Sequence, residues 1–323
     1  MRLYLTLAGS VAAWLPVMTD YPVNEDTPSI ELYMFKPHHN VVPGYVIVDI
    51  AARCRAYQTV DPVQLNGLTL GCINDTIVAK MGDKLIRINA DIVNSLREDH
   101  VYVLSPKDGS LYPVEVRLSN AYMRLHFPRG VDAPTLMING IHMHRVSDIG
   151  PLRDARYKVA AARVRHGHTV LDICTGLGYT AITSLEFGAK QVYTIEVSRE
   201  VLAIAEFNPW SARLADNRVK IMLGDASKLI EFFPDSVFDR IVHDPPRFSI
   251  AGELYSSDFY RELYRVLRPG GVLFHYTGEP LRSRGHGHGP VVRGVIQRLR
   301  GVGFLRIRYN EKAQGVVAVK PRY

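Results

Sequence analysis

The second half of the chain alternates short apolar runs with segments that place apolar residues at helical spacing. The apolar runs, which we predict to be strands, are His168–Cys174, Gln191–Val197, Val219–Leu223, Phe238–His243 and Val272–Tyr276. The predicted helices are Leu152–Val164, Tyr179–Phe187, the stretch after Ser198, the stretch around Leu229, Ser257–Leu267 and Val291–Arg300. Strands that alternate with helices in this way form a parallel sheet with helices on both faces.

Two more apolar runs, Phe304–Tyr309 and Gly315–Lys320, lie close enough in the chain to pair as a hairpin. The hairpin would add an antiparallel strand to the sheet. The pattern therefore predicts an α/β domain over residues 148–323, a Rossmann-like, doubly wound sheet of seven strands with a C-terminal antiparallel hairpin. Ligands of such sheets bind at the carboxyl ends of the strands.

The first half of the chain has a different pattern, with runs rich in Val, Ile, Tyr and Thr between turn residues. These runs are Arg2–Leu7, Tyr45–Ile50, Leu68–Ile73, Lys84–Ile88, His100–Leu104, Val114–Leu118 and Tyr122–Phe127. Only Asp91–Glu98 has a convincing helical pattern. We therefore expect a smaller, mostly β accessory domain over residues 1–147, which could help to bind the substrate.

The composition, with 47% hydrophobic and 22% charged residues, is typical of a soluble globular protein, and 323 residues leave room for two domains. No apolar run reaches the ~18 residues that a membrane span needs. Three cysteines, Cys54, Cys72 and Cys174, are too few and too scattered for a disulfide framework or a zinc site. We therefore expect reduced thiols, no metal, no membrane association and a cytoplasmic location.

Positive charge is concentrated in the second half. Residues 1–150 carry 13 Lys and Arg against 15 Asp and Glu, whereas residues 151–323 carry 26 against 17. The stretch from Leu281 to Tyr309 holds seven arginines and no acid. Such a field favours an anionic partner such as RNA. The arginines that we expect to contact RNA are Arg282, Arg284, Arg293 and Arg298.

The segment from Asp172 to Tyr179 follows the first predicted strand of the sheet and opens a helix. Glycines at such a bend let the backbone approach a ligand closely, and the helix N-terminus presents free N–H groups. The spacing Gly176-x-Gly178-x-x-Ala181 also fits the fingerprint of dinucleotide-binding proteins. The bend alone therefore suits NAD and S-adenosylmethionine (SAM) equally well.

Acidic residues stand at the ends of the next three strands. Glu196 ends the second strand, where a carboxylate can accept hydrogen bonds from the ribose hydroxyls of either cofactor. Asp225 ends the third strand, where it could accept from an adenine amino group. The fourth strand ends in Asp244-Pro-Pro-Arg247-Phe248, and its two prolines withhold N–H donors. An acceptor-only rim suits a nitrogen nucleophile that approaches an electrophilic methyl group, and it offers nothing obvious to hydride transfer.

With these acids in this order, the chain from Leu152 to Pro321 resembles the class I SAM-dependent methyltransferase family. The resemblance implies that SAM is the cofactor. The cofactor-binding residues that it implies are Asp172, Cys174, Gly176, Gly178 and Tyr179 around the methionine part, Glu196 at the ribose, Asp225 at the adenine, and Asp244. It also implies that Asp244 and Arg247 line the site of methyl transfer as the catalytic residues.

The chain departs from the family pattern at two places. Cys174 stands where the loop has its first glycine, and Arg247 stands where the motif [DNS]-P-P-[YFW] has its aromatic residue. Phe248 follows one position later, so that Asp-Pro-Pro-x-Phe is similar to the motif of rRNA base methyltransferases. The wider sequence is similar to an uncharacterised group of predicted archaeal methyltransferases.

The function that we expect is transfer of the SAM methyl group to a nitrogen on RNA. Methylation of a small molecule or a protein is an alternative. Aminopropyl transfer from decarboxylated SAM is another, although the Gly-Gly-Gly-Asp-Gly loop of spermidine synthases is absent. Two further hypotheses are an NAD-dependent dehydrogenase and an RNA-binding protein without activity, and the intact strand-end acids argue against the second of these.

Overall fold

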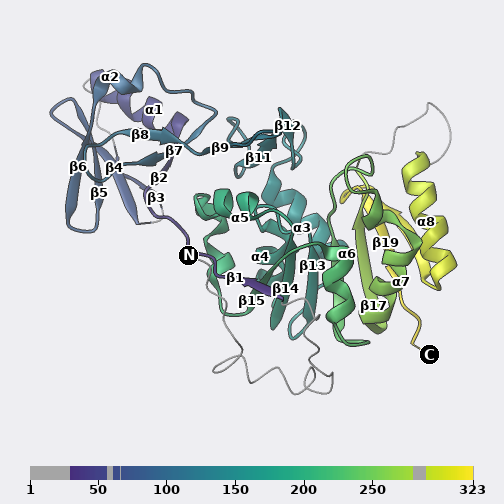
Figure 1. Ribbon diagram of the computed structural model, residues 1–323. Helices are drawn as coiled ribbons and strands as arrows, with labels where there is room; N and C mark the ends of the chain where they lie inside the picture. Colours follow the sequence, from purple (N-terminus) through teal and green to yellow (C-terminus); the bar gives the residue numbers. More distant parts are fainter. Residues whose placement is uncertain (1–29, 57–60, 66, 279–288, 323) are drawn as a thin grey trace.

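The computed structural model describes residues 30–56, 61–65, 67–278 and 289–322. Its largest feature is an eight-stranded sheet, shown in Figure 1. The strands lie in the order β1 (Glu31–Tyr33), β15 (Val219–Leu223), β14 (Gln191–Glu196), β13 (Thr169–Ile173), β16 (Phe238–His243), β17 (Leu267–Tyr276), β19 (Gly315–Val319) and β18 (Leu305–Asn310). The predicted α/β class and its seven strands are confirmed.

The five strands from β15 to β17 are parallel, and β19 runs antiparallel between β17 and β18. The chain moves from β13 outwards to β15 and then crosses back to β16, so the strand order reverses between β13 and β16. In open α/β sheets a ligand crevice forms beyond the carboxyl ends of the strands at such a reversal. The fold therefore places the expected ligand crevice at the carboxyl ends of β13, β14 and β16.

Strand β1 is an addition to the predicted sheet. Residues 31–33 pair antiparallel with residues 221–223 of β15, at the edge of the sheet. A segment from the first half of the chain thus completes the sheet of the second half. The strand predicted at Arg2–Leu7 lies outside the described residues.

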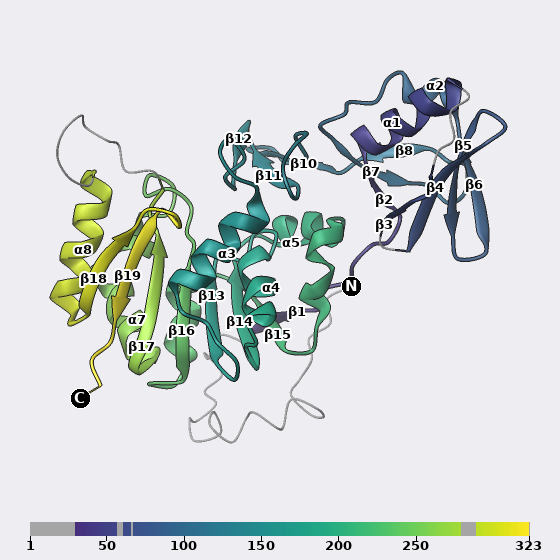
Figure 2. The ribbon, with the colours of Figure 1, turned by 180° about the vertical axis from the view of Figure 1, so that it is seen from behind.

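Helices cover both faces of the sheet, which Figures 1 and 2 show from opposite sides. One face is covered by α3 (Pro151–Ala161), α4 (Tyr179–Glu186) and α5 (Arg199–Glu206), and the other by α6 (Ala226–Leu229), α7 (Ser257–Val266) and α8 (Pro290–Val302). The 3-10 helices are η2 (Pro209–Ala215), η3 (Ile230–Phe232) and η4 (Gly252–Tyr255). Alternate residues of each strand face opposite cores, as Val170 and Leu171 do in β13. Among the described residues no helix is long and apolar enough to span a membrane.

Apart from β1, the described residues of the first half of the chain form three small antiparallel sheets and two helices. The sheets comprise β2 (Val41–Pro43), β7 (Val101–Leu104) and β8 (Leu111–Pro113); β3 (Val63–Leu65), β4 (Leu68–Ile73), β5 (Thr76–Met81) and β6 (Lys84–Ile88); and β9 (Glu115–Arg117), β10 (Tyr122–His126), β11 (Thr135–Ile138) and β12 (Ile141–His142). The helices are α1 (Gly44–Arg55) and α2 (Ala90–Val93). The sheet of β9 to β12 contacts α5 and connects this β-rich unit to the large sheet (Figure 2).

The prediction of a strand at Tyr45–Ile50 is wrong, because these residues lie in α1. Local enrichment in Val and Ile favoured a strand, but burial of one helix face outweighs that preference. The buried residues of this face, spaced three or four apart, are Ile47, Ile50, Ala51 and Cys54. The helix predicted at Asp91–Glu98 is also largely wrong, since α2 ends at Val93.

A disulfide joins Cys54 of α1 to Cys72 of β4, with the two Cα atoms 5.9 Å apart. The expectation that all three cysteines are reduced thiols is therefore wrong for this pair. The two residues are 18 apart in the sequence, and α1 packs across β4 so that their side chains meet. Sequence spacing alone does not show which cysteines a fold brings together. Cys174 is the one cysteine that remains free within the described residues.

We expect the bond between Cys54 and Cys72 to stabilise the β-rich unit by about 3 kcal/mol, because it restricts a loop of this length in the unfolded chain. The variant with Cys54→Ser and Cys72→Ser should lose this contribution in urea unfolding without reductant. Dithiothreitol should lower the stability of the parent protein by a similar amount and leave the variant unchanged. Equal stability of parent and variant in the absence of reductant would show that the bond does not contribute.

Candidate active site

Strand β13 ends in a bend whose backbone is left-handed at alternate residues. The angle φ is +71° at Cys174, +53° at Gly176 and +78° at Gly178, the residue that precedes α4. Cys174 therefore holds a conformation that glycine adopts most easily, which accounts for the glycine at this place in the methyltransferase pattern. A Cβ on Gly178 would lie 2.5 Å from Leu214, whereas one on Gly176 would meet nothing within 4 Å. The backbone of Gly176 thus faces open space.

Glu196 joins the end of β14 to this bend. Its Oε2 accepts the N–H of Gly176 with an N···O distance of 2.9 Å, and its Oε1 accepts the N–H of Ser198 at 3.1 Å. Glu196 is only 7% exposed, and burial raises its pKa although the two N–H groups oppose the rise. The carboxylate therefore lies beside the open space at Gly176, where the sequence predicts an acid for ribose.

Asp225 follows directly at the end of β15. The N–H of Gly224 donates to the backbone carbonyl of Glu196 at 2.8 Å, which keeps the two strand ends together. Asp225 Oδ1 accepts both the N–H (2.9 Å) and the hydroxyl (2.7 Å) of Ser227 and so caps α6. Its Oδ2 has no hydrogen-bond partner within the described ranges and is available to an amino group.

Asp244, at the end of β16, is held by a lysine from α3. Lys158 Nζ lies 2.8 Å from Asp244 Oδ1 and 2.7 Å from Asp244 Oδ2. The same ammonium lies 2.8 Å from Asp154 Oδ2 and 4.0 Å from the ring centroid of Tyr276. Burial lowers the pKa of Lys158, but Asp244 and Asp154 outweigh this and keep it above its usual value. Lys158 is therefore a buried ammonium shared between two carboxylates.

Two comparisons with known proteins identify the family to which this chain belongs. A family model described as a methyltransferase domain matches residues 170–271. The uncharacterized protein MJ1233 of the archaeon Methanocaldococcus jannaschii is 45% identical over 236 residues, which cover 73% of this chain and 79% of that protein. The chain belongs to the class I SAM-dependent methyltransferase family.

Other relatives of the methyltransferase share shorter regions. Ribosomal RNA large subunit methyltransferase I of Aeromonas hydrophila is 32% identical over 126 residues, which cover 36% of this chain and 32% of that protein. The spermidine synthase of Thermotoga maritima matches in structure with 17% identity and a TM-score of 0.51, over 65% of this chain and 72% of that one. A spermidine synthase in complex with the transition-state analogue AdoDATO matches with 17% identity and a TM-score of 0.53, over 68% of this chain and 78% of that one. At such identities the structural likeness shows the fold alone.

Asp172 provides a test of whether the methyltransferase site fits its cofactor. Asp172 Oδ2 accepts the Thr194 hydroxyl at 2.7 Å, while the buried Oδ1 has no partner among the described residues. Burial raises the pKa of Asp172 to about 7, and Asp244 adds to the rise. A buried carboxylate with an unpaired oxygen is stabilised by a nearby cation. SAM is such a cation, so Asp172, Gly176 and Glu196 fit it.

Tyr179 is the first residue of α4, and its side chain packs away from the bend. Its hydroxyl donates to the carbonyl of Pro134 at 2.7 Å and accepts from Asn208 Nδ2 at 2.8 Å. Both partners lie in segments that pack against α4, and Tyr179 is 3% exposed. A contact between Tyr179 and SAM would therefore come from its backbone.

The other predicted catalytic residue, Arg247, is exposed on the loop after β16, as is Phe248. Two contacts with Tyr255 hold this loop in place. Tyr255 donates its hydroxyl to the carbonyl of Pro246 at 2.8 Å, and the ring of Phe248 lies edge-on to Tyr255 with centroids 5.4 Å apart. The structure thus places Arg247 at the rim of the site, while Asp244 lies inside it.

The structure describes two of the four arginines that the sequence predicts to contact RNA. Arg293 is exposed on α8. Arg298 is half-buried beside Tyr260, where burial raises the pKa of the Tyr260 hydroxyl and Arg298 opposes that rise. Arg282 and Arg284 lie outside the described residues.

The described ranges contain no group of three His, Cys, Asp or Glu side chains placed to hold a metal ion.

The residue that sequence reasoning missed is Lys158. A signal was present, because Lys158 stands three residues after Ala155 and four before Ala162, at the spacing of the buried face of α3. A charged residue on such a face needs a partner. Asp154, four residues earlier, is one of its partners, but Asp244 comes from a distant strand and cannot be found by local spacing.

We expect Lys158→Met to lower the free energy of unfolding by about 3 kcal/mol at neutral pH, because it leaves the Asp244 carboxylate partly buried without its cation. Asp154 keeps its ion pair with Arg145. Since an unpaired, buried Asp244 has a raised pKa, the loss should shrink as the pH falls and the carboxyl takes up a proton. Urea unfolding between pH 5 and pH 8 measures this dependence.

The matched control combines Lys158→Met with Asp244→Asn, which removes both charges of the pair. This double variant should regain most of the lost stability and lose the pH dependence. A single variant as stable as the parent protein at neutral pH, or a double variant no better than the single one, would contradict the assigned ion pair.

Proposed function

We propose that the methyltransferase transfers the methyl group of SAM to a nitrogen atom of an RNA base. The observation that carries this proposal is the fixed carboxylate of Asp244, held at 2.7 and 2.8 Å by Lys158 beside two prolines that present no N–H. Two further observations support RNA. The second half of the chain carries 26 basic against 17 acidic residues. A shorter region is similar to a ribosomal RNA methyltransferase.

SAM, when bound, supplies a methyl group on a positively charged sulfur, which is already a good electrophile. The chain then has to hold the acceptor atom in line with that methyl group and exclude water. The Glu196 carboxylate, which the Gly176 N–H holds in place, would accept from the ribose hydroxyls of the nucleoside part, and Asp225 Oδ2 would accept from its amino group.

Asp244 can orient the acceptor even though Lys158 occupies it. Each carboxylate oxygen has two lone pairs, and Lys158 uses one on each. The remaining lone pairs can accept an N–H of the base and direct the nitrogen towards the methyl group. Asp244 is then also the group to receive the proton that this nitrogen loses.

The same ion pair disfavours aminopropyl transfer. A polyamine substrate is a multiple cation and needs unpaired carboxylates. Here Asp244 and Asp154 already share the ammonium of Lys158, whose charge would repel a second cation. Methyl transfer to a neutral base nitrogen meets no such repulsion.

The test incubates the protein with labelled SAM and separate pools of tRNA, rRNA, protein and small metabolites, and then identifies the methylated nucleoside by mass spectrometry. We expect label in RNA and a methyl group on nitrogen. Asp244→Ala should lower the turnover number by about 100-fold or more, because the acceptor loses its orienting base. Asp258→Asn, which removes an exposed acid of α7, is the matched control and should retain full activity.

Label in the protein or metabolite pool alone would overturn RNA as the substrate and leave SAM use intact. A methyl group on carbon or oxygen of the nucleoside would overturn the choice of nitrogen. Full activity of Asp244→Ala would remove the role given to this carboxylate.

A further inference from the structure

A hollow of about 200 Å³ lies between α3 and the edge strand β18, beside the β18–β19 hairpin. Tyr157 and Arg163 line it from α3 and the turn after it, and Arg308, Asn310 and Lys312 line it from β18 and the hairpin. Three cations, one phenol and one amide therefore face the same space. No acidic residue lines it, and Glu311, the nearest acid in the sequence, is exposed.

The cations of this hollow have no side-chain partners in the part of the chain that the structure describes. In the described ranges, the side chains of Arg163, Arg308 and Lys312 make no ion pair or hydrogen bond, and the backbone carbonyl of Arg163 accepts from Arg240 Nε at 2.9 Å. Burial lowers the pKa of Arg240, Asp239 opposes this fall, and the nearby charges of Arg165 and Arg163 add to it. The three cations that line the hollow thus have no ion pair within the described ranges, which favours the binding of an anion.

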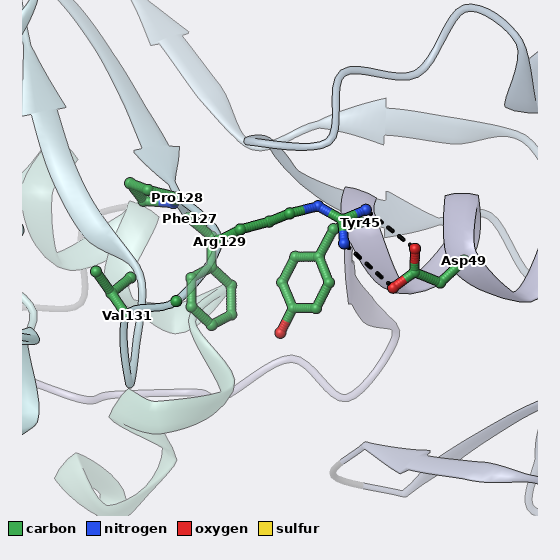
Figure 3. Close-up of a pocket in the computed structure, with 7 residues that line it drawn as sticks. Tyr45, Asp49, Phe127, Pro128, Arg129 and Val131 are labelled. Atoms are coloured by element: carbon green, nitrogen blue, oxygen red, sulfur yellow. Dashed lines mark hydrogen bonds and ion pairs between the residues drawn. The ribbon is translucent and has the colours of Figure 1, made fainter.

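A second hollow shows the opposite arrangement. A cavity of about 190 Å³ between α1 and the segment after β10 is lined by Tyr45, Phe127 and Arg129 (Figure 3). Its arginine is already paired, with Arg129 Nη2 at 3.0 Å from Asp49 Oδ1 and Arg129 Nε at 2.8 Å from Glu98 Oε2. That cavity has no free charge to offer, so the unpaired cations distinguish the hollow beside β18.

Direct contacts connect this hollow to the catalytic edge of the sheet. Arg145 Nη1 donates to the backbone carbonyl of Lys312 at 2.8 Å and to Asp154 Oδ1 at 3.1 Å. Asp154 in turn pairs with Lys158, which holds Asp244. Three side chains, those of Arg145, Asp154 and Lys158, therefore link one end of the hollow to the Asp244 carboxylate.

We propose that the hollow between α3 and β18 binds backbone phosphates of the RNA strand next to the base that is methylated. The proposal rests on RNA as the substrate. Arginine offers paired N–H groups that match the oxygens of a phosphodiester, and Tyr157 and Asn310 add neutral donors. Phosphate contacts position a strand without reading its bases, so the hollow fixes where the RNA lies while the catalytic site selects the atom.

The test measures binding of a short fluorescein-labelled single-stranded RNA to the full chain by anisotropy, over about 50 to 200 mM salt. The variant with Arg163→Gln and Arg308→Gln removes two cations of the hollow. Loss of two phosphate contacts should reduce the slope of log affinity against log salt by about 1.4 and weaken binding about tenfold. The matched control, Arg213→Gln with Arg261→Gln, removes the same net charge from arginines that face acids and should change the slope little.

Calorimetry with SAM checks that both variants retain the cofactor site. Equal salt slopes for the test variant and the control would overturn the proposal, as would tighter binding of AMP than of RNA to the hollow. A parent protein that methylates no RNA, but whose salt slope still depends on Arg163 and Arg308, would refute RNA as the substrate and retain the phosphate site.

Discussion

The hydrogen bond from the Gly176 N–H to Glu196 Oε2 fixes the geometry on which the cofactor site depends. It connects the ends of two adjacent parallel strands, and it forms only because the backbone after β13 turns through left-handed conformations at Cys174, Gly176 and Gly178. Parallel strands end at one edge of the sheet, so an acid at the end of β14 lies beside the bend after β13. A residue with a Cβ is strained in this left-handed backbone conformation. Cys174 adopts it despite the strain, whereas glycine adopts it without strain.

A second interaction completes the site from the other side of the reversal in strand order. Lys158 brings a buried positive charge from α3 to Asp244 at the end of β16 and to Asp154 on its own helix. Arg145 balances the remaining charge of Asp154 and contacts the β18–β19 hairpin. One network of charges thus connects the Asp244 carboxylate, the helix before the sheet and the cationic hollow at its edge.

Much of this arrangement could be predicted from the sequence, because it follows from short-range patterns. Apart from β1, which was not predicted, and the longer β17, the strands of the large sheet begin and end within one or two residues of their predicted bounds, since each is a run of apolar residues between turn signals. Ser198 caps α5 with its hydroxyl, as its place before an apolar helix indicates. The acids at the strand ends are found in the same way, because the fold class alone places them at one edge.

What could not be predicted depends on contacts between distant segments. The strand β1, the disulfide between Cys54 and Cys72, and the pair of Lys158 with Asp244 all join residues that local patterns do not relate. The first turns of α1, Tyr45–Ile50, were predicted as a strand because Val and Ile favour strands, and burial of one helix face outweighs that preference. The sequence shows that positive charge is concentrated in the second half of the chain, but the group of cations beside β18 is found only when β18 lies next to α3.

If acids at successive strand ends converge on one SAM molecule, Glu196 holds its ribose. Isothermal titration calorimetry of SAM with the parent protein, Glu196→Gln and Glu231→Gln tests this arrangement most directly. We expect one SAM site, about tenfold or more weaker binding in Glu196→Gln, and unchanged binding in Glu231→Gln, which alters an exposed acid of η3. Unchanged affinity in Glu196→Gln, or binding of NAD in place of SAM by the parent protein, would contradict it.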